Sequence, residues 1–460
     1  MKVVDLAYCG LGLRGIGVIG FVGALGYLAA KSPLLALALP ALGACLILLR
    51  WPPAGILALV VAGQMLPFSI GTGTETRLNA AVLLLPVLIG LWVLEILARR
   101  EFPRFPARTI LPLIALSGAA TLAFVAGVEP WMVFAQTAPI RSQIGELALF
   151  FLSAGVFLLA GYQLRDVRWL QALTWLFLVS GALYVAGQLV PGVGHVIATL
   201  FARGSDGSLF WVWLPVLSFS QAAFNRRAPL AWRLVLGGVA CSTFYMALSQ
   251  EKIGWTSGWL PAVAAVLVAL WAGAPRLGLL VTVASALLVA LDPSAVSNLV
   301  MAGDNQYSLD TRVEAWTILE KVVDISLVLG LGPANYYWYT PLFPIEGYAV
   351  HFNSHNNYVD LIAQTGVLGL ACFLWFAAEV GVMGWRLRNR VGEGFERAYV
   401  CGAVGGLAGT LTAGMLGDWV LPFVYNIGFT GFRASMLAWL FLGGLVALEQ
   451  SVLPRSCQVR

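Results

Sequence analysis

The sequence predicts an all-α integral membrane protein, a polytopic bundle of about 12 to 14 transmembrane helices with one long external loop that contains an amphipathic helix. The first observation is composition. Of the 460 residues, 60% are hydrophobic and 11% are charged, whereas soluble domains have about half apolar and a quarter charged residues. The second is that the apolar residues form repeated runs of about 20, each long enough to cross the hydrocarbon core as a helix. These observations exclude a soluble fold.

The first apolar run, residues 15–30, is interpreted as a membrane helix and not as a cleaved signal. Lys31 and a second apolar run follow it, where a secreted protein would continue into a polar mature domain. About fourteen candidate spans can be counted in all. They start near Gly15, Pro33, Pro53, Asn79, Ile110, Ile144, Trp169, Leu209, Leu234, Trp255, Leu277, Asn356, Ala398 and Thr430. We therefore expect residues 1–460 to form a single polytopic membrane domain.

The distribution of basic residues predicts the orientation of the spans. With the N-terminus inside and the spans alternating, most of the 27 Lys and Arg residues fall in inner loops, in clusters around Arg99, Arg226 and Arg388. Because inner loops are enriched in Lys and Arg, both termini are predicted to be cytoplasmic. The basic residues that fall on the outer side are Lys31, Arg77, Arg141, Arg203, Lys252, Arg312, Lys321 and Arg433.

Charge and cysteine content argue against nucleic-acid binding and a metal site. The formal net charge of +5 comes from short loops between spans, so no nucleic-acid partner is expected. The cysteines form no CxxC or Cys/His grouping, and the outer side has no Asp-X-Asp pair. We therefore expect neither a metal nor another cofactor. The six cysteines are Cys9, Cys45, Cys241, Cys372, Cys401 and Cys457.

One long polar segment, residues 292–354, interrupts the pattern of short connections and is predicted to be external. A loop of this length is usually functional or disordered, and its many aromatic residues favour an ordered loop. Val313, Trp316, Leu319 and Val323 recur at helical spacing. We expect an amphipathic helix from residue 311 to about residue 325, lying across the mouth of the bundle.

Arg312 is the first candidate for chemistry. Thr311 and Glu314 have the spacing of a capping box, which would place Arg312 at the first helical position, beside free backbone N–H groups and the positive end of the helix dipole. Such a helix end binds phosphate readily. Alternatively, Arg312 pairs with Asp310 or Glu314 on a solvated helix, and both interpretations remain open.

His355 is the second candidate, because it lies where the long loop re-enters the membrane. At the water interface its pKa would be the unperturbed value of about 6.5, which suits removal of a proton from a sugar hydroxyl. The alternative is that this histidine only anchors the chain at the membrane boundary. Downstream, Gly366 and Gly369 would allow close helix packing.

Lys252 and a group of aromatic residues complete the candidate site. Lys252 begins an apolar helix on the outer side and could reach a diphosphate near the interface, or else extend to water beside Glu251. The aromatic residues are candidates for stacking on sugar rings, and are equally expected as an interfacial belt. They are Trp316, Tyr336, Tyr337 and Trp338.

The order and spacing of four segments resemble the core of the O-antigen ligase and polymerase family. The segments are Arg312 to Trp316, Gly330-Leu-Gly-Pro-Ala-Asn335, His355-Asn-Asn-Tyr and Gly366-Val-Leu-Gly369. They span residues 309–376, with weaker similarity near Lys252, so a ligase-like core is expected over residues 240–376, including the loop 292–354. Ligases usually carry arginine, in a Ser-Arg-Gly-like sequence, where this chain has Lys252. A lysine keeps the charge but loses the bidentate geometry.

The resemblance implies an inverting, metal-independent glycosyltransferase of the bacterial inner membrane, surrounded by membrane lipid. Arg312 and Lys252 would bind the diphosphate of a polyprenyl-diphosphate-linked glycan donor. His355 would activate or position the acceptor hydroxyl on the periplasmic side. The acceptor is a lipid A core in a ligase and a lipid-linked glycan in a polymerase, and both alternatives remain open.

The alternative from another class is a transporter or flippase for lipid-linked glycans. It would place ionisable residues toward a cavity at the membrane midplane. Glu146, Asp360 and Asp418 instead fall near the predicted span ends, which favours an active site close to the membrane surface.

Overall fold

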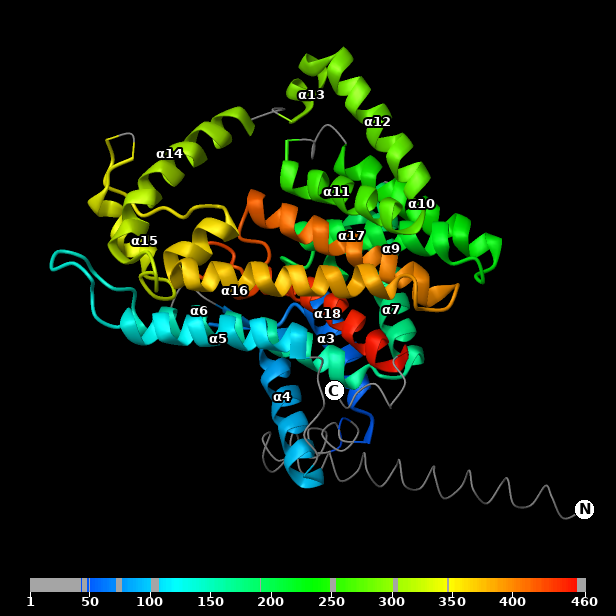
Figure 1. The fold of residues 1–460 in the computed structure, drawn as a ribbon, viewed down its shortest axis with the longest axis horizontal. Helices are drawn as coiled ribbons and strands as arrows, with labels where there is room; N and C mark the ends of the chain where they lie inside the picture. Colours follow the sequence, from blue (N-terminus) through cyan, green and yellow to red (C-terminus); the bar gives the residue numbers. More distant parts are fainter. Residues whose placement is uncertain are drawn as a thin grey trace, which may run out of the picture. The chain divides into compact units, whose positions relative to one another are not determined.

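The computed structural model describes residues 43, 48, 50–71, 77–100, 107–190, 192–248, 254–300, 305–345 and 347–452. The chain divides into two compact units, residues 1–55 and residues 56–460. The packing and the site described below belong to the second unit (Figure 1). Lys252, the first predicted span and most of the second lie outside the described residues.

The described part of the chain is almost entirely helical. Its helices are α3 (Pro52–Met65), α4 (Ala80–Arg99), α5 (Ala107–Ala126), α6 (Ile140–Gln163), α7 (Val167–Leu189), α8 (Gly194–Leu200), α9 (Ser208–Phe224), α10 (Leu230–Ala247), α11 (Thr256–Gly273), α12 (Pro275–Leu291), α13 (Pro293–Val300), α14 (Asn305–Val323), α15 (Tyr336–Tyr339), α16 (Asn357–Leu387), α17 (Phe395–Leu416) and α18 (Gly428–Val452). Two short 3-10 helices, η1 (Asp324–Ser326) and η2 (Thr340–Leu342), lie in the long loop.

The lengths and composition of these helices confirm an all-α polytopic membrane protein. Among the described residues, eight helices are long and apolar enough to cross a membrane, and four shorter apolar helices accompany them. Every predicted span from the one near Pro53 onward corresponds to one of these helices. Because a helix satisfies its own backbone hydrogen bonds, it is the element that such apolar runs form in lipid.

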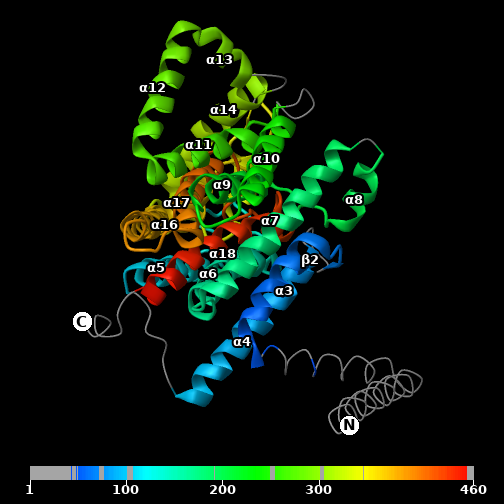
Figure 2. The same cartoon turned by 90° about the vertical axis from the view of Figure 1, so that its right-hand side faces the viewer.

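The helices pack around α18, the most buried of the eight. Of an 18-residue apolar stretch in α18, 94% is buried inside the protein. The helix lies along α6, as Figure 2 also shows. Helix α16 lies between α5 and α17, and α17 in turn packs on α9 and α11. Buried aromatic rings fill the spaces between helices, as where Phe376 of α16 stacks on Trp439 of α18 with centroids 5.4 Å apart.

A short antiparallel hairpin, β1 (Ser69–Gly71) and β2 (Arg77–Asn79), connects α3 to α4. Its last residue, Asn79, caps α4 by accepting hydrogen bonds from the amides of Ala81 (3.0 Å) and Val82 (3.1 Å). The side-chain amide of Asn79 also donates to the Phe429 carbonyl in α18. These bonds attach the hairpin to the beginning of α18.

Helix α16 is interrupted at Gly366, whose backbone has φ +67° and ψ −173°. The interruption frees the carbonyls of residues 363–364, which accept the amides of residues 331–332 at 2.9 and 3.0 Å. It also frees the amides of residues 367–368, which donate to the carbonyls of residues 327–328 at 2.9 and 3.4 Å. The long loop therefore replaces these four backbone groups' lost partners, as a break among apolar helices requires.

Asn335 fastens the same part of the loop to the ends of α5 and α6. Its side-chain amide donates to Gly127 O (2.7 Å) and Leu331 O (2.8 Å), and its side-chain oxygen accepts from Ala138 N (2.9 Å). The segment 330–335 is thus a buried scaffold. The close approach predicted for Gly366 exists, but the neighbouring group is the backbone of Val328 in this loop and not another helix.

The long loop contains the predicted amphipathic helix, now seen as α14. It packs against α16 and η2 and buries Ala315, Leu319 and Val322, while Val313 is exposed. The predicted start was wrong: α14 begins at Asn305, six residues before Thr311. The capping-box spacing gave the wrong start for the helix, because the residues before Thr311 also fit a helix.

Candidate functional site

The turn that carries His355 is fixed by hydrogen bonds on both sides of it. Ser354 is buried, with its hydroxyl oxygen 2.7 Å from Asp360 Oδ1, and it accepts the Asn356 amide at 2.9 Å. Asn356 caps α16 through the amides of Tyr358 (2.9 Å) and Val359 (3.4 Å). His355 lies between these residues with φ +48°. This left-handed conformation costs a non-glycine residue roughly 1–2 kcal/mol, and the surrounding bonds hold it.

Two aromatic side chains connect the loop helices to this turn. Trp316 of α14 donates from its indole nitrogen to Ser354 O at 2.8 Å. Tyr336 of α15 donates from its hydroxyl to Asp360 Oδ1 at 2.5 Å and accepts from Ser354 N at 3.3 Å. The position of His355 therefore depends on both loop helices.

Arg312 lies about two turns inside α14, since the helix begins at Asn305. The prediction that Arg312 stands at a helix N-terminus was therefore wrong, and any anion there is attracted by the guanidinium itself. Its Nη1 donates to Leu416 O, the last residue of α17, at 3.1 Å. Burial lowers the pKa of Arg312, and the charge of Asp418 acts in the opposite direction.

The positive charge of Arg312 acts on the ionisation of His355, which indicates that the two side chains lie near each other. Burial first, and the charge of Arg312 second, lower the pKa of His355 to about 4. The prediction of an unperturbed pKa for His355 was wrong, since the imidazole is half-buried. At neutral pH the ring is uncharged and available to accept a proton.

Asn426 joins His355 to a buried carboxyl. Its amide nitrogen donates to Asp418 Oδ1 at 2.7 Å and lies 3.4 Å from His355 Nδ1. Burial raises the pKa of Asp418. Arg312, bonded at Leu416, and His355, facing Asn426, thus meet opposite ends of the connection between α17 and α18, residues 417–427.

Buried carboxyl groups hold this α17–α18 connection in place. Asp418 Oδ2 accepts Phe423 N at 2.9 Å, and Glu146 of α6 accepts Val424 N at 2.7 Å. Asn357 in the first turn of α16 accepts Val420 N at 2.8 Å and donates to Leu421 O at 2.7 Å. Sequence reasoning identified none of these roles. The only signal was the presence of polar residues at a span boundary.

The predicted sugar-binding aromatics form part of an internal stack. Tyr336 is fully buried and stacks on Phe423 with centroids 4.8 Å apart, so its ring is not accessible to a sugar. Tyr337 lies between Tyr425 and His351, at 4.6 and 4.9 Å.

Trp338 is half-buried, and its indole nitrogen donates to Tyr425 Oη at 2.9 Å. Trp316 is also half-buried. Sugar contact remains a prediction for Trp316, Tyr337 and Trp338. Tyr336 does not fit that role, because its faces and hydroxyl are committed to the protein.

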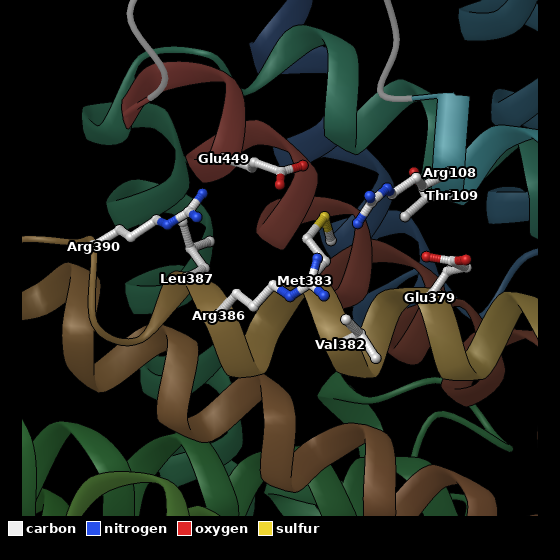
Figure 3. Close-up of a pocket in the computed structure, with 9 residues that line it drawn as sticks. All are labelled: Arg108, Thr109, Glu379, Val382, Met383, Arg386, Leu387, Arg390 and Glu449. Carbon is white, nitrogen blue, oxygen red and sulfur yellow. The ribbon is translucent and has the colours of Figure 1, made fainter. Parts of the chain in front are cut away.

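A small cavity of about 280 Å³ lies at the opposite end of α16, and we name it the α16-end cavity. Figure 3 shows Arg108, Arg386 and Arg390 pointing into it together with Glu379 and Glu449. It is separated from His355 by most of α16, which is about 45 Å long at 1.5 Å per residue. From the distribution of basic residues along the sequence, all three arginines are predicted to lie on the cytoplasmic side.

Within the described ranges, no three His, Cys, Asp or Glu side chains are arranged to hold a metal ion. The site itself combines an uncharged imidazole and a guanidinium with the Asp418–Asn426 pair. This combination can accept a proton and stabilise a departing anion.

Comparison with known families places this geometry in context. Residues 195–374 match the family model of O-antigen ligase. The matched region runs from α8 past the break in α16, so it includes Lys252, Arg312 and His355 and begins well before residue 240. A comparison with curated proteins gives no match.

Proposed function

Because the match over residues 195–374 supports membership of the O-antigen ligase family, we propose that this chain is a membrane glycosyltransferase. It moves a glycan from a polyprenyl-diphosphate donor to an acceptor hydroxyl at the periplasmic face of the inner membrane. The observation that carries this proposal is that Arg312 and His355, from different elements, contact the two ends of the α17–α18 connection, and that the charge of Arg312 acts on the ionisation of His355.

The proposed reaction is a displacement at the anomeric carbon with inversion. The acceptor oxygen forms a bond to the anomeric carbon as the bond from that carbon to the diphosphate oxygen breaks. The hydroxyl proton passes to His355, and the lipid diphosphate leaves with the electron pair. Arg312 stabilises the charge that develops on the diphosphate. Lys252, which lies outside the described residues, is proposed as a second cation for the same group.

The pKa of His355 fits a base that acts only when donor is bound. A pKa of about 4 keeps the ring uncharged, but it also makes the imidazole a weak base. A bound diphosphate would offset the charge of Arg312, which is one of the two causes of the low pKa. The base therefore becomes stronger as the donor enters, and the proton it takes is balanced by the leaving anion.

The buried carboxyls favour this proposal over a transporter. Glu146 and Asp418 accept backbone amides of the α17–α18 connection, and Asp360 accepts from Tyr336. A transport pathway would present such groups to a cavity. Here Glu146 and Asp418 brace the segment that His355 contacts, and Asp360 braces the turn that carries His355.

The direct test is glycan transfer by the purified chain from a polyprenyl-diphosphate-linked oligosaccharide, in the presence of a chelator. Wild type is expected to be active, and His355→Ala to lose at least about a hundredfold in rate, since a general base contributes about 10²–10⁴. His195→Ala is the matched control and retains activity. Offering a lipid A core and a lipid-linked glycan as separate acceptors distinguishes a ligase from a polymerase. Unchanged transfer by His355→Ala would contradict the proposal.

A further inference from the structure

A second cavity, of about 780 Å³, lies beside the candidate site and is not used by the reaction described so far. The hairpin β1–β2 forms one of its walls, so we name it the hairpin cavity. The other walls are the segment before α9, the residue before α11, the α17–α18 connection and the beginning of α18. Its volume falls within the range of about 300–1,000 Å³ that is typical of sites for small molecules.

Three arginines line the hairpin cavity, although the predicted outer side of the protein has few basic residues. Arg77, Arg203 and Arg433 line it, against one acidic residue, Asp206, which accepts a hydrogen bond from Tyr184 at 2.7 Å. All three arginines are among the few basic residues that the charge count assigns to the outer side. Arg77 and Arg203 are exposed, and neither side chain has an ion pair or a hydrogen bond within the described part of the chain.

Arg433 adds a buried charge that has no ion pair within the described ranges. It is only 3% exposed, and its guanidinium donates to Ala62 O and Gly63 O at 3.0 Å each and to Phe68 O at 3.1 Å. These carbonyls satisfy its hydrogen bonds but are uncharged. Burying a charge without an opposite charge is costly, so an anion in the cavity would offset this cost.

Two indole rings give the cavity a surface that suits sugars. Trp255 and Trp419 both line it and meet edge to face with centroids 5.9 Å apart. Such rings offer flat apolar area for the C–H faces of a glycan. Cations and indoles together fit a ligand that is both sugar and anion.

The cavity extends to Asn426, which contacts the proposed catalytic base. Asn426 lines the cavity, and its amide nitrogen lies 3.4 Å from His355 Nδ1. That contact is long for a hydrogen bond, so a hydroxyl entering from the cavity can replace it. Arg312 contacts the α17–α18 connection at its other end, at Leu416, which leaves the donor diphosphate on a separate side of His355.

From these observations we infer that the hairpin cavity is the acceptor subsite of the proposed transferase. It selects acceptors whose sugars carry phosphate or carboxylate groups. That the bound sugar is an acceptor rests on the proposed function. The binding of an anionic sugar to this cavity does not depend on that function. Arg77 and Arg203 hold the anionic group, Trp255 and Trp419 contact the sugar, and the reacting hydroxyl lies beside Asn426.

The test is equilibrium binding to the purified full-length chain in nanodiscs, followed by saturation-transfer NMR, which registers weak ligands. The probes are glucose 1-phosphate, glucuronate, glucose and farnesyl diphosphate, the last standing in for the donor. In the double variant Arg77→Ser/Arg203→Ser, binding of one or both anionic sugars is expected to weaken by about tenfold or more. Glucose and farnesyl diphosphate should bind as they do to wild type.

Two comparisons sharpen the result. Arg386→Ser, in the α16-end cavity, removes a cation of the same kind and should leave all four probes unaffected. Arg312→Ser should weaken farnesyl diphosphate and spare the anionic sugars. Which sugar loses affinity in the double variant identifies phosphate or carboxylate as the recognised group.

Three outcomes would overturn the inference: no binding of either anionic sugar to wild type, binding unaffected in the double variant, or loss of farnesyl diphosphate in that variant. The last would assign the cavity to the donor. If the binding pattern is as expected while glycan transfer is absent, the anion-selective sugar site stands and the proposed transferase function fails. The two failures are therefore distinguishable.

Discussion

At the residue scale, the site depends on an imidazole that is kept uncharged. Two independent causes, burial and the charge of Arg312, lower the pKa of His355 to about 4. Its backbone is held in a left-handed conformation by Ser354 and Asn356. Non-glycine residues in this conformation gather at functional sites because the surrounding structure has to hold them there.

Replacing Arg312 with Gln should raise the pKa of His355 toward its ordinary value. The shift will be partial, because burial is the larger cause and remains. In wild type the ring gains its proton only as the pH falls through about 4, and in the variant this happens at higher pH. The measurement is an NMR titration of ¹⁵N-histidine, in which the chain has only three histidines to assign. A pKa for His355 that is equal in the two proteins would show that the two side chains do not interact.

The sequence predicted the two residues of the site but not their surroundings. Arg312 and His355 stand out as rare basic groups in and beside a loop that is predicted to be external. The low pKa of His355 could not be predicted, because it comes from burial by α14, α15 and the α17–α18 connection. Asn426 was missed for the same reason: nothing in the sequence brings residue 426 to residue 355.

At the element scale, the interrupted helix α16 determines how the long loop is attached. The break at Gly366 exchanges backbone hydrogen bonds with residues 327–332, and this exchange fixes the end of α14 against α16. The sequence predicted this helix and its glycines. It did not predict the break, because the mostly apolar stretch around Gly366 also fits a continuous helix.

Gly366→Ala should destabilise the protein strongly. Its φ of +67° disfavours any side chain, and a Cβ there would collide with the Val328 carbonyl. We expect a melting temperature at least several degrees lower and a matching loss of transfer. Gly118→Ala on α5, where a Cβ meets no atom within 4 Å, is the control and should be neutral or stabilising. Thermal unfolding in detergent measures both, and equal melting temperatures would mean that the interruption is absent.

At the scale of the whole molecule, the α16-end cavity and the candidate site lie at opposite ends of α16. Arg108, Arg386 and Arg390 meet in the α16-end cavity, whereas His355 and Arg312 lie where α16 begins. The span count and the positive-inside rule predict the same separation from the sequence alone. The sequence could predict this separation because the hydropathy of the spans and the positions of the arginines along the chain depend little on tertiary contacts.

Labelling with a membrane-impermeant maleimide should confirm the orientation. In a cysteine-free background, Lys321→Cys on α14 is expected to react in intact spheroplasts, and Arg226→Cys between α9 and α10 only after lysis. Both positions are exposed in the structure, so access alone is not limiting. The reverse pattern would place the candidate site in the cytoplasm and contradict the proposed periplasmic reaction.

The central claim is that Arg312 and His355 act together on one donor, and a double-mutant cycle on the transfer rate tests it most directly. Rates are measured for wild type, Arg312→Gln, His355→Gln and the double variant with a fixed acceptor. If the two residues serve one transition state, the double variant should be little slower than the slower single variant, because residues that act as a unit are not additive. Losses that simply multiply, or a rate that neither substitution changes, would contradict the account.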